Sequence, residues 1–172
     1  MVSHNLHKYT ALRDFSQAGA ELQIGGLPIS QLVERYGTPL YVYDAAMLIE
    51  NYRTVCRALP QFEVFYALKA NPSLALCTLF HEQGAGAELA SGGELKLALK
   101  AGFPPAKIVF AGPAKTDTEL AQAVEAGIAS VNVESFAELA RLEIVARKMG
   151  KRVNASLRIN TKQSDVTTPE VM

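Results

Sequence analysis

The amino-acid sequence predicts an α/β fold built on a parallel sheet. From residue 63 onward, short apolar runs alternate with stretches of helical period. The helix starts recur every ~20–25 residues, which leaves room for a strand, a helix and two short loops. The short runs are apolar rather than alternating, which is typical of parallel strands covered by helices. We therefore expect a series of right-handed strand–helix units.

Composition and charge restrict the class of protein. The 172 residues suffice for one domain, and 49% are apolar and 20% charged, as in globular proteins. Lys plus Arg equals Asp plus Glu at 17 each, so no net field favours nucleic acid or a membrane. The first 15 residues lack the apolar segment of a secretory signal. We expect a cytoplasmic protein in which Cys56 and Cys77 are buried free thiols, and the spacing of the three histidines predicts no metal site.

The N-terminal part is expected to hold a strand and two helices. A strand at 21–24 ends at Gly25, and a helix at 28–36 begins near Pro28 and stops at Gly37. After a short apolar run, Asp44 is placed to cap a helix at 45–59.

Five strand–helix repeats follow. Strands are expected at 63–69, 86–90, 107–111, 130–133 and 152–159, with helices at 72–83, 92–100, 117–126 and 136–149. Asn71 is expected to cap the first helix, with Pro72 at its first position. The other helix starts have the S/T-x-x-E pattern of a capping box, at Ser91 with Glu94, Thr116 with Glu119, and Ser135 with Glu138.

Two architectures fit this pattern, an open doubly wound sheet and an eight-stranded barrel. The first strand is not followed by G-x-G-x-x-G, which weighs against a dinucleotide-binding sheet. A complete barrel takes ~250 residues, and the sequence after Asn160 is polar and aperiodic. We expect a truncated chain with an N-terminal segment at 1–36, a partial barrel at 37–160 and an unstructured tail at 161–172.

Lys69 is the candidate for chemistry. It ends an apolar strand and should face the same side as Phe65 and Ala67. Barrel enzymes place their active sites at the carboxyl ends of the strands. A low-dielectric mouth would disfavour the ammonium, and a neutral amine condenses with an aldehyde. The alternative is a lysine that simply extends into solvent.

The segment Tyr66-Ala-Leu-Lys-Ala-Asn71 resembles the pyridoxal-phosphate (PLP) lysine motif of the ornithine/diaminopimelate/arginine decarboxylase family, which has the alanine-racemase-like barrel fold. The resemblance runs in order from residue 21 to residue 160 and is nearest to the diaminopimelate branch. Its other parts are Gly37–Asp44, Gly84–Leu95, Lys107–Pro113, Val131–Ser135 and Arg158-Ile-Asn160.

The resemblance implies roles for individual residues. Lys69 would form the internal aldimine with PLP, and Ala67 would lie under the pyridine ring. Arg158 would lie near the cofactor, and Glu88 would be the acidic residue near cofactor and lysine, where the family more often has Asp. Ser91 and Glu94 fall on family positions near the site, although a capping box explains them equally well.

The resemblance also implies the activity and the partners. It predicts a PLP-dependent amino-acid decarboxylase, with diaminopimelate as the leading substrate and a homodimer as the full-length form. The family's ring-stacking histidine, glycine-rich phosphate loop and C-terminal β-domain have no counterpart in these 172 residues. We therefore expect little or no activity from this chain alone. The alternatives are a non-catalytic PLP-binding fragment or pseudoenzyme, a decarboxylase of another basic or a carrier-bound amino acid, and an alanine-racemase-like isomerase.

Overall fold

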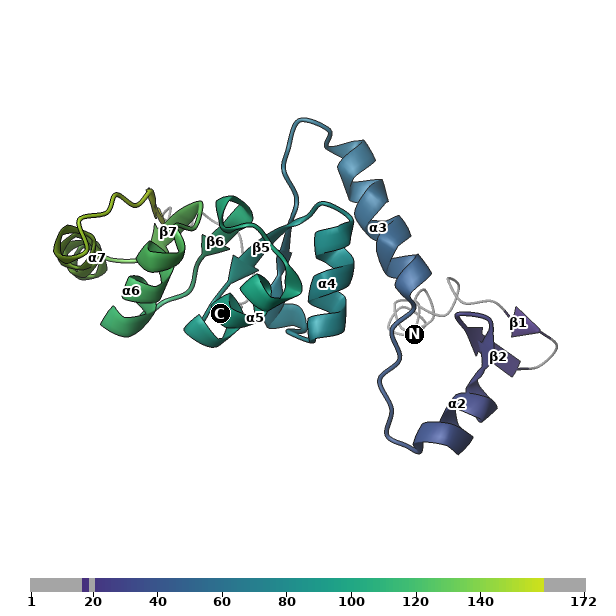
Figure 1. Ribbon diagram of the computed structural model, residues 1–172. Coiled ribbons are helices and arrows are strands. Elements are labelled where there is room, and N and C mark those ends of the chain that lie inside the picture. Colours follow the sequence, from purple (N-terminus) through teal and green to yellow (C-terminus); the bar gives the residue numbers. More distant parts are fainter. Residues whose placement is uncertain (1–16, 19–20, 160–172) are drawn as a thin grey trace, which may run out of the picture. The chain divides into compact units, whose positions relative to one another are not determined.

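The computed structural model describes residues 17–18 and 21–159 of the chain. These residues fall into two compact units, Met1–Gln61 and Phe62–Met172, which are described separately (Figure 1). The predicted tail at 161–172 and Asn160 lie outside the described residues. The domain division at residue 37 stays a prediction.

The first unit contains a small antiparallel sheet and two helices. The strands are β1 (Gln17–Ala18), β2 (Glu21–Ile24) and β3 (Leu27–Pro28), in that order across the sheet, and the helices are α2 (Ile29–Tyr36) and α3 (Ala45–Ala58). The cap predicted at Asp44 is confirmed, because its Oδ1 accepts from the N–H groups of Ala46 and Met47. The other carboxylate oxygen accepts from Gly25 N–H at 3.0 Å and so ties the start of α3 to the turn after β2.

The second unit is a five-stranded parallel sheet with the strands in sequence order, β4-β5-β6-β7-β8. The strands are β4 (Phe65–Ala67), β5 (Gly86–Leu89), β6 (Ile108–Phe110), β7 (Ser130–Val133) and β8 (Ala155–Leu157). The helices are α4 (Leu74–Glu82), α5 (Gly92–Ala101), α6 (Asp117–Ala126) and α7 (Phe136–Lys148), with short 3₁₀ turns at η2 (Leu68–Ala70) and η3 (Pro105–Lys107). The predicted α/β order is confirmed.

All four helices of this unit pack on one face of the sheet. That face carries Leu89, Phe110 and Val131, which are in register on neighbouring strands and fully buried. They form one core with side chains from α4, α5, α6 and α7, including Cys77, Leu95, Leu120 and Leu142. The opposite face is half-buried or exposed and carries Phe65, Ala67, Glu88, Val109, Ser130, Asn132 and Ser156. A doubly wound sheet has helices on both faces, so the arrangement is that of a barrel segment.

The chain around Lys69 differs from the prediction. The strand predicted at 63–69 ends at Ala67, and Lys69 lies in the 3₁₀ turn η2. The predicted helix cap at Asn71 is wrong, because α4 begins at Leu74 and has Ser73 at the N-cap position. Asn71 is extended, with φ −164° and ψ 108°, as an N-cap residue would be. Ser73 is extended as well, with φ −55° and ψ 129°, so the helix cannot begin before Leu74. The Asn71 side chain instead accepts from Ser73 N–H at 2.9 Å and closes a local turn.

The last strand is also shorter than predicted, three residues in place of the range 152–159. It is the edge strand β8, and all three of its residues are exposed. Within the part of the chain that the structure describes, no helix has the length and apolar character needed to cross a membrane.

Candidate active site

Lys69 lies at the carboxyl end of the parallel sheet, beside an acidic residue of the next strand. Its Nζ is 4.0 Å from Oε2 of Glu88, which pairs with Ala67 in the register of β4 and β5. The prediction that Lys69 reaches the face of Ala67 is therefore confirmed, although a 3₁₀ turn and not strand alternation takes it there. The Lys69 side chain is 68% exposed, so the low-dielectric mouth expected from the sequence is not formed by the described residues.

The turn that carries Lys69 is anchored on both sides. Leu68 is fully buried in the core below the sheet. The Tyr66 hydroxyl donates to the carbonyl of Asn71 at 2.8 Å, and the Tyr66 ring stacks on Phe80 of α4 with centroids 4.1 Å apart. The structure thus adds Tyr66 to the residues that place Lys69. Its position inside the motif was visible in the sequence, but its hydrogen bond was not.

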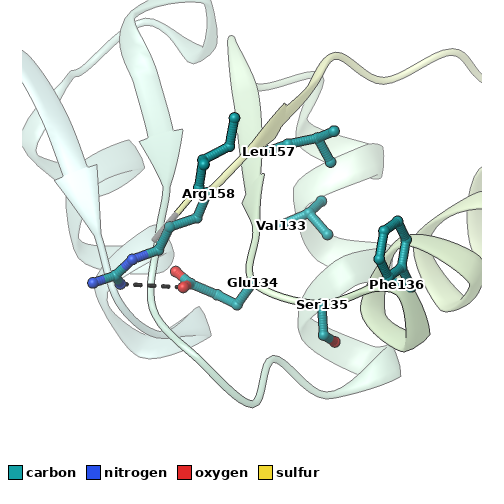
Figure 2. A pocket seen from close by; sticks show the side chains of 7 residues that line it. Val133, Glu134, Ser135, Phe136, Leu157 and Arg158 are labelled. Carbon is teal, nitrogen blue, oxygen red and sulfur yellow. Dashed lines mark hydrogen bonds and ion pairs between the residues drawn. The ribbon is translucent and has the colours of Figure 1, made fainter. Parts of the chain in front are cut away.

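Arg158 follows β8 and points over the same end of the sheet. Its Nη1 donates to Oε2 of Glu134 at 3.1 Å, and its backbone N–H donates to the carbonyl of Val133 at 3.0 Å. Figure 2 shows Glu134 and Arg158 turned toward each other. The Glu134 side chain is 15% exposed, so this carboxylate is largely enclosed. Glu134 was not among the residues predicted from the sequence.

A cavity brings Glu88 and Arg158 together. It has a volume of about 330 Å³ and is lined by Glu88, Ala111, Asn132, Glu134, Ser156, Leu157 and Arg158. These residues come from the carboxyl-terminal parts of β5 to β8 or directly follow them. Lys69 contacts this set through Glu88. Lys69, Glu88 and Arg158 therefore lie at the same end of the sheet, and their roles toward a cofactor stay predictions.

A second cavity adjoins the first and is mostly apolar. It measures about 420 Å³ and is lined by Val133, Glu134, Ser135, Phe136, Leu157, Arg158 and Ile159 (Figure 2). Phe136, the first residue of α7, is 89% exposed. Because Glu134 and Arg158 line both cavities, their ion pair lies between them.

Ser91 and Glu94 cap helix α5. Ser91 Oγ accepts from the Glu94 N–H at 3.2 Å, and Glu94 Oε2 accepts from the Ala90 N–H at 2.7 Å. The prediction that these two residues cap the helix is confirmed. The Glu94 carboxylate, however, accepts from the N–H of Ala90, the residue before the N-cap, and not from that of Ser91 itself. Neither residue lines the two cavities above. Their contact with a cofactor stays a prediction.

The start of helix α6 has a complete capping box and also contacts α5. Thr116 Oγ1 accepts from Glu119 N–H, and Glu119 Oε2 accepts from Thr116 N–H. The other Glu119 oxygen accepts from the Gly92 N–H at 2.8 Å. Hydrogen bonds from the N–H groups of Gly92 and Thr116 lower the pKa of Glu119. This carboxylate therefore joins the N-termini of two neighbouring helices.

The two cysteines differ in their surroundings. Cys77 in α4 is fully buried, and burial raises the pKa of its thiol. Cys56 in α3 is half-buried. The prediction of two buried thiols is thus confirmed for Cys77 and wrong for Cys56, which lies in a helix of the first unit without a fully buried residue.

The described residues at this end of the sheet have the chemical groups that a PLP site needs. An accessible primary amine lies beside a carboxylate, and a guanidinium lies across the same sheet end, as an anionic aldehyde cofactor requires. Ala111 is small and lines the cavity at this end of the sheet, and Ala67 is half-buried on the same face. Over residues 17–18 and 21–159, no three His, Cys, Asp or Glu side chains gather as metal ligands.

Residues 45–171 match the family described as pyridoxal-dependent decarboxylase, pyridoxal binding domain. The chain belongs to this family. The chain is 43% identical over 151 residues to the diaminopimelate decarboxylase of Aquifex aeolicus, covering 88% of this chain and 36% of the relative. It is 40% identical over 159 residues to that of Pseudomonas aeruginosa, covering 91% and 38%.

Solved structures agree with this assignment. The crystal structure of the enzyme from Methanocaldococcus jannaschii superposes with a TM-score of 0.87 at 34% identity, covering 93% of this chain and 39% of that one. The predicted family and the partial alanine-racemase-like barrel are confirmed. The chain spans little more than a third of the length of the relatives it matches.

Proposed function

We propose that this domain binds PLP through Lys69 and serves a PLP-dependent decarboxylase that acts on diaminopimelate. The observation that carries the proposal is the Lys69 amine, 4.0 Å from the Glu88 carboxylate at the carboxyl end of a one-sided parallel sheet. The relatives that match most of this chain are named diaminopimelate decarboxylases, which supports the choice of substrate.

Several residues of the chain would bind and position the cofactor. Bound PLP supplies the electron-withdrawing ring that decarboxylation requires. Lys69 offers the amine that holds the cofactor, and Glu88, whose Oε2 is 4.0 Å from that amine, would stabilise its protonated form electrostatically. Ala67 leaves room for a flat ring above β4. Arg158, held by its ion pair with Glu134, would present its guanidinium to an anionic group of a ligand bound in the cavity.

Ser91 and Glu94 would contribute through the helix they cap. Their oxygens fix the first turn of α5 directly after β5, the strand that carries Glu88. A direct contact between either residue and PLP belongs to the proposal as well, and it would have to coexist with the capping bonds.

The proposal extends to the protein that contains this domain. We propose a homodimer in the cytoplasm with a small amino acid as substrate. The match to little more than a third of each relative supports the further proposal that turnover requires parts beyond the described residues. The exposure of Lys69 favours a second candidate for the chain by itself, a module that captures PLP without turning over an amino acid.

Titration with PLP tests the proposal. We expect the absorption of PLP to shift on addition of the chain, because the cofactor bonds to an amine. Lys69→Ala should abolish the shift, whereas Lys96→Ala, which removes an exposed lysine of α5, should not. Equal spectra for the wild type and Lys69→Ala would refute the proposal. Release of carbon dioxide from diaminopimelate would separate a decarboxylase from a module that only captures PLP.

A further inference from the structure

Two charged residues lie in the interior, next to the proposed site. Lys115 is 2% exposed and Glu138 is 3% exposed, and among the described residues these are the buried charged side chains. Lys115 belongs to the loop after β6, and Glu138 to the first turn of α7. Their Nζ and Oε1 atoms are 2.7 Å apart. Burying an ion pair is costly, and an apolar pair of similar volume is often as stable or more so.

Every polar group of this pair has a partner. The ammonium has three protons, and Lys115 Nζ donates to the carbonyls of Gly112 and Asn132 and to Glu138, each at 2.7 Å. The second oxygen of Glu138 accepts from the backbone N–H of Glu134 at 3.2 Å. The pair therefore joins the loop after β6, the end of β7 and the start of α7.

The bonds of the pair lead to the cavity at the end of the sheet. Asn132 and Glu134, whose backbones the pair holds, both line the cavity that contains Glu88 and Arg158. The carboxylate of Glu134 in turn accepts from Arg158 at 3.1 Å (Figure 2). A continuous series of polar contacts thus runs from Lys115 through Glu138 and Glu134 to Arg158.

Helix capping accounts for only one oxygen of the Glu138 carboxylate. The equivalent residue of α6, Glu119, returns to the N–H of its own N-cap residue, Thr116. Glu138 Oε2 accepts from the residue before its N-cap, as Glu94 does in α5, and Ser135 Oγ caps the Glu138 N–H at 3.1 Å. Its other oxygen, Oε1, goes beyond capping and bonds the buried Lys115. An exposed glutamate would satisfy the cap, so the burial of this one indicates another role.

We propose that Lys115 and Glu138 are positioning residues that act through Glu134 to orient Arg158 toward an anionic group of the bound ligand. This inference rests on the proposed function, because the ligand is PLP or its amino-acid adduct. It differs from a purely structural role, since it assigns the pair an effect on ligand affinity that passes through one named guanidinium.

Paired replacements separate the two roles. Lys115→Met/Glu138→Leu removes the cost of burying two charges but leaves the carbonyls of Gly112 and Asn132 and the Glu134 N–H without their partners, so the variant should fold with a lower free energy of unfolding. The apparent dissociation constant for PLP should also rise about tenfold, as for one lost network interaction. Glu134→Gln, which leaves the pair intact, should give a similar loss of affinity.

A double-mutant cycle with Arg158→Ala gives the decisive readout. If Glu138 acts through Arg158, Glu138→Gln should weaken PLP binding in the wild type and hardly change it in Arg158→Ala. Without PLP, hydrogen exchange at the Glu134 amide should accelerate in Lys115→Met/Glu138→Leu, because its acceptor is gone. Additive effects in the cycle, or affinity within twofold of the wild type for both Glu134→Gln and the double variant, would overturn the inference. If the wild type bound PLP no better than Lys69→Ala, the proposed function would fail first, and the inference with it.

Discussion

Replacing Gly92 with alanine tests the contact between helices α5 and α6. An added Cβ would lie 2.7 Å from Gln122 Oε1 and 2.9 Å from Glu119 Cγ, both on α6. Gln122 can rotate away at its flexible end, but Glu119 cannot move without losing its hydrogen bond from Gly92 N–H. Alanine at the next position, Gly93, would meet Ser91 Oγ at 3.7 Å, an ordinary contact. The same substitution one residue apart is therefore expected to act in opposite directions.

The magnitudes follow from two competing terms. Alanine in place of a helical glycine stabilises by about 1 kcal/mol at most. Losing a hydrogen bond to a charged group costs about 1.5–3 kcal/mol. We expect Gly92→Ala to lower the free energy of unfolding by about 1–2 kcal/mol, and Gly93→Ala to raise it by about 0.5 kcal/mol.

Chemical and thermal unfolding of the two variants measures the difference. A change of 1 kcal/mol shifts the melting temperature by roughly 2–4 °C in a chain of this length. The two variants should therefore melt on opposite sides of the wild type. If both alanines raised the melting temperature, or both lowered it equally, the bridging role of Glu119 would be refuted.

Three further predictions concern single groups. The N–H groups that Glu119 bonds lower the pKa of its carboxyl group in the folded chain below the unfolded pKa of 4.5. The stability that this carboxylate contributes is therefore complete at pH values above 4.5, and it is lost as the pH falls through the pKa of the folded state. Stability curves of the wild type and Glu119→Gln should thus differ at pH 7 and converge in acid, and a constant gap would contradict this. Alkylation followed by mass spectrometry should label Cys56 before Cys77, since Cys77 is fully buried and burial raises its pKa; equal rates in the folded protein would argue against that burial. Tyr66→Phe keeps the ring but loses the 2.8 Å hydrogen bond to the Asn71 carbonyl, so it should lower the free energy of unfolding by about 1 kcal/mol. It should also slow the binding of PLP, and an unchanged binding rate would show that Tyr66 does not place Lys69.

Local signals in the sequence were sufficient for the order of elements in the second unit and for the starts of α5, α6 and α7. The side chains of Ser91, Thr116 and Ser135 each accept from the third helical residue, as their patterns predict. A cap involves neighbours in the chain, so a short motif determines it. The turn at Lys69 was predicted less well, because an extended strand and a 3₁₀ turn cannot be told apart over three residues.

The tertiary parts of the site could not be predicted from the sequence. Glu88 and Arg158 were found through the family resemblance, since the register that brings Glu88 to Lys69 is set by the pairing of β4 with β5. Neither Glu134 nor Lys115 was predicted to belong to the site. Lys115 stands in a polar loop where an exposed lysine is the usual outcome, and its burial depends on Glu138, which is 23 residues away in the sequence.

Borohydride reduction in the presence of PLP, followed by peptide mapping, tests the assignment of Lys69 most directly. At limiting PLP, the account predicts a stable pyridoxyl group on the peptide that contains Lys69 and none on that peptide in Lys69→Ala. A label spread evenly over the exposed lysines, or concentrated on a lysine other than Lys69, would contradict the account.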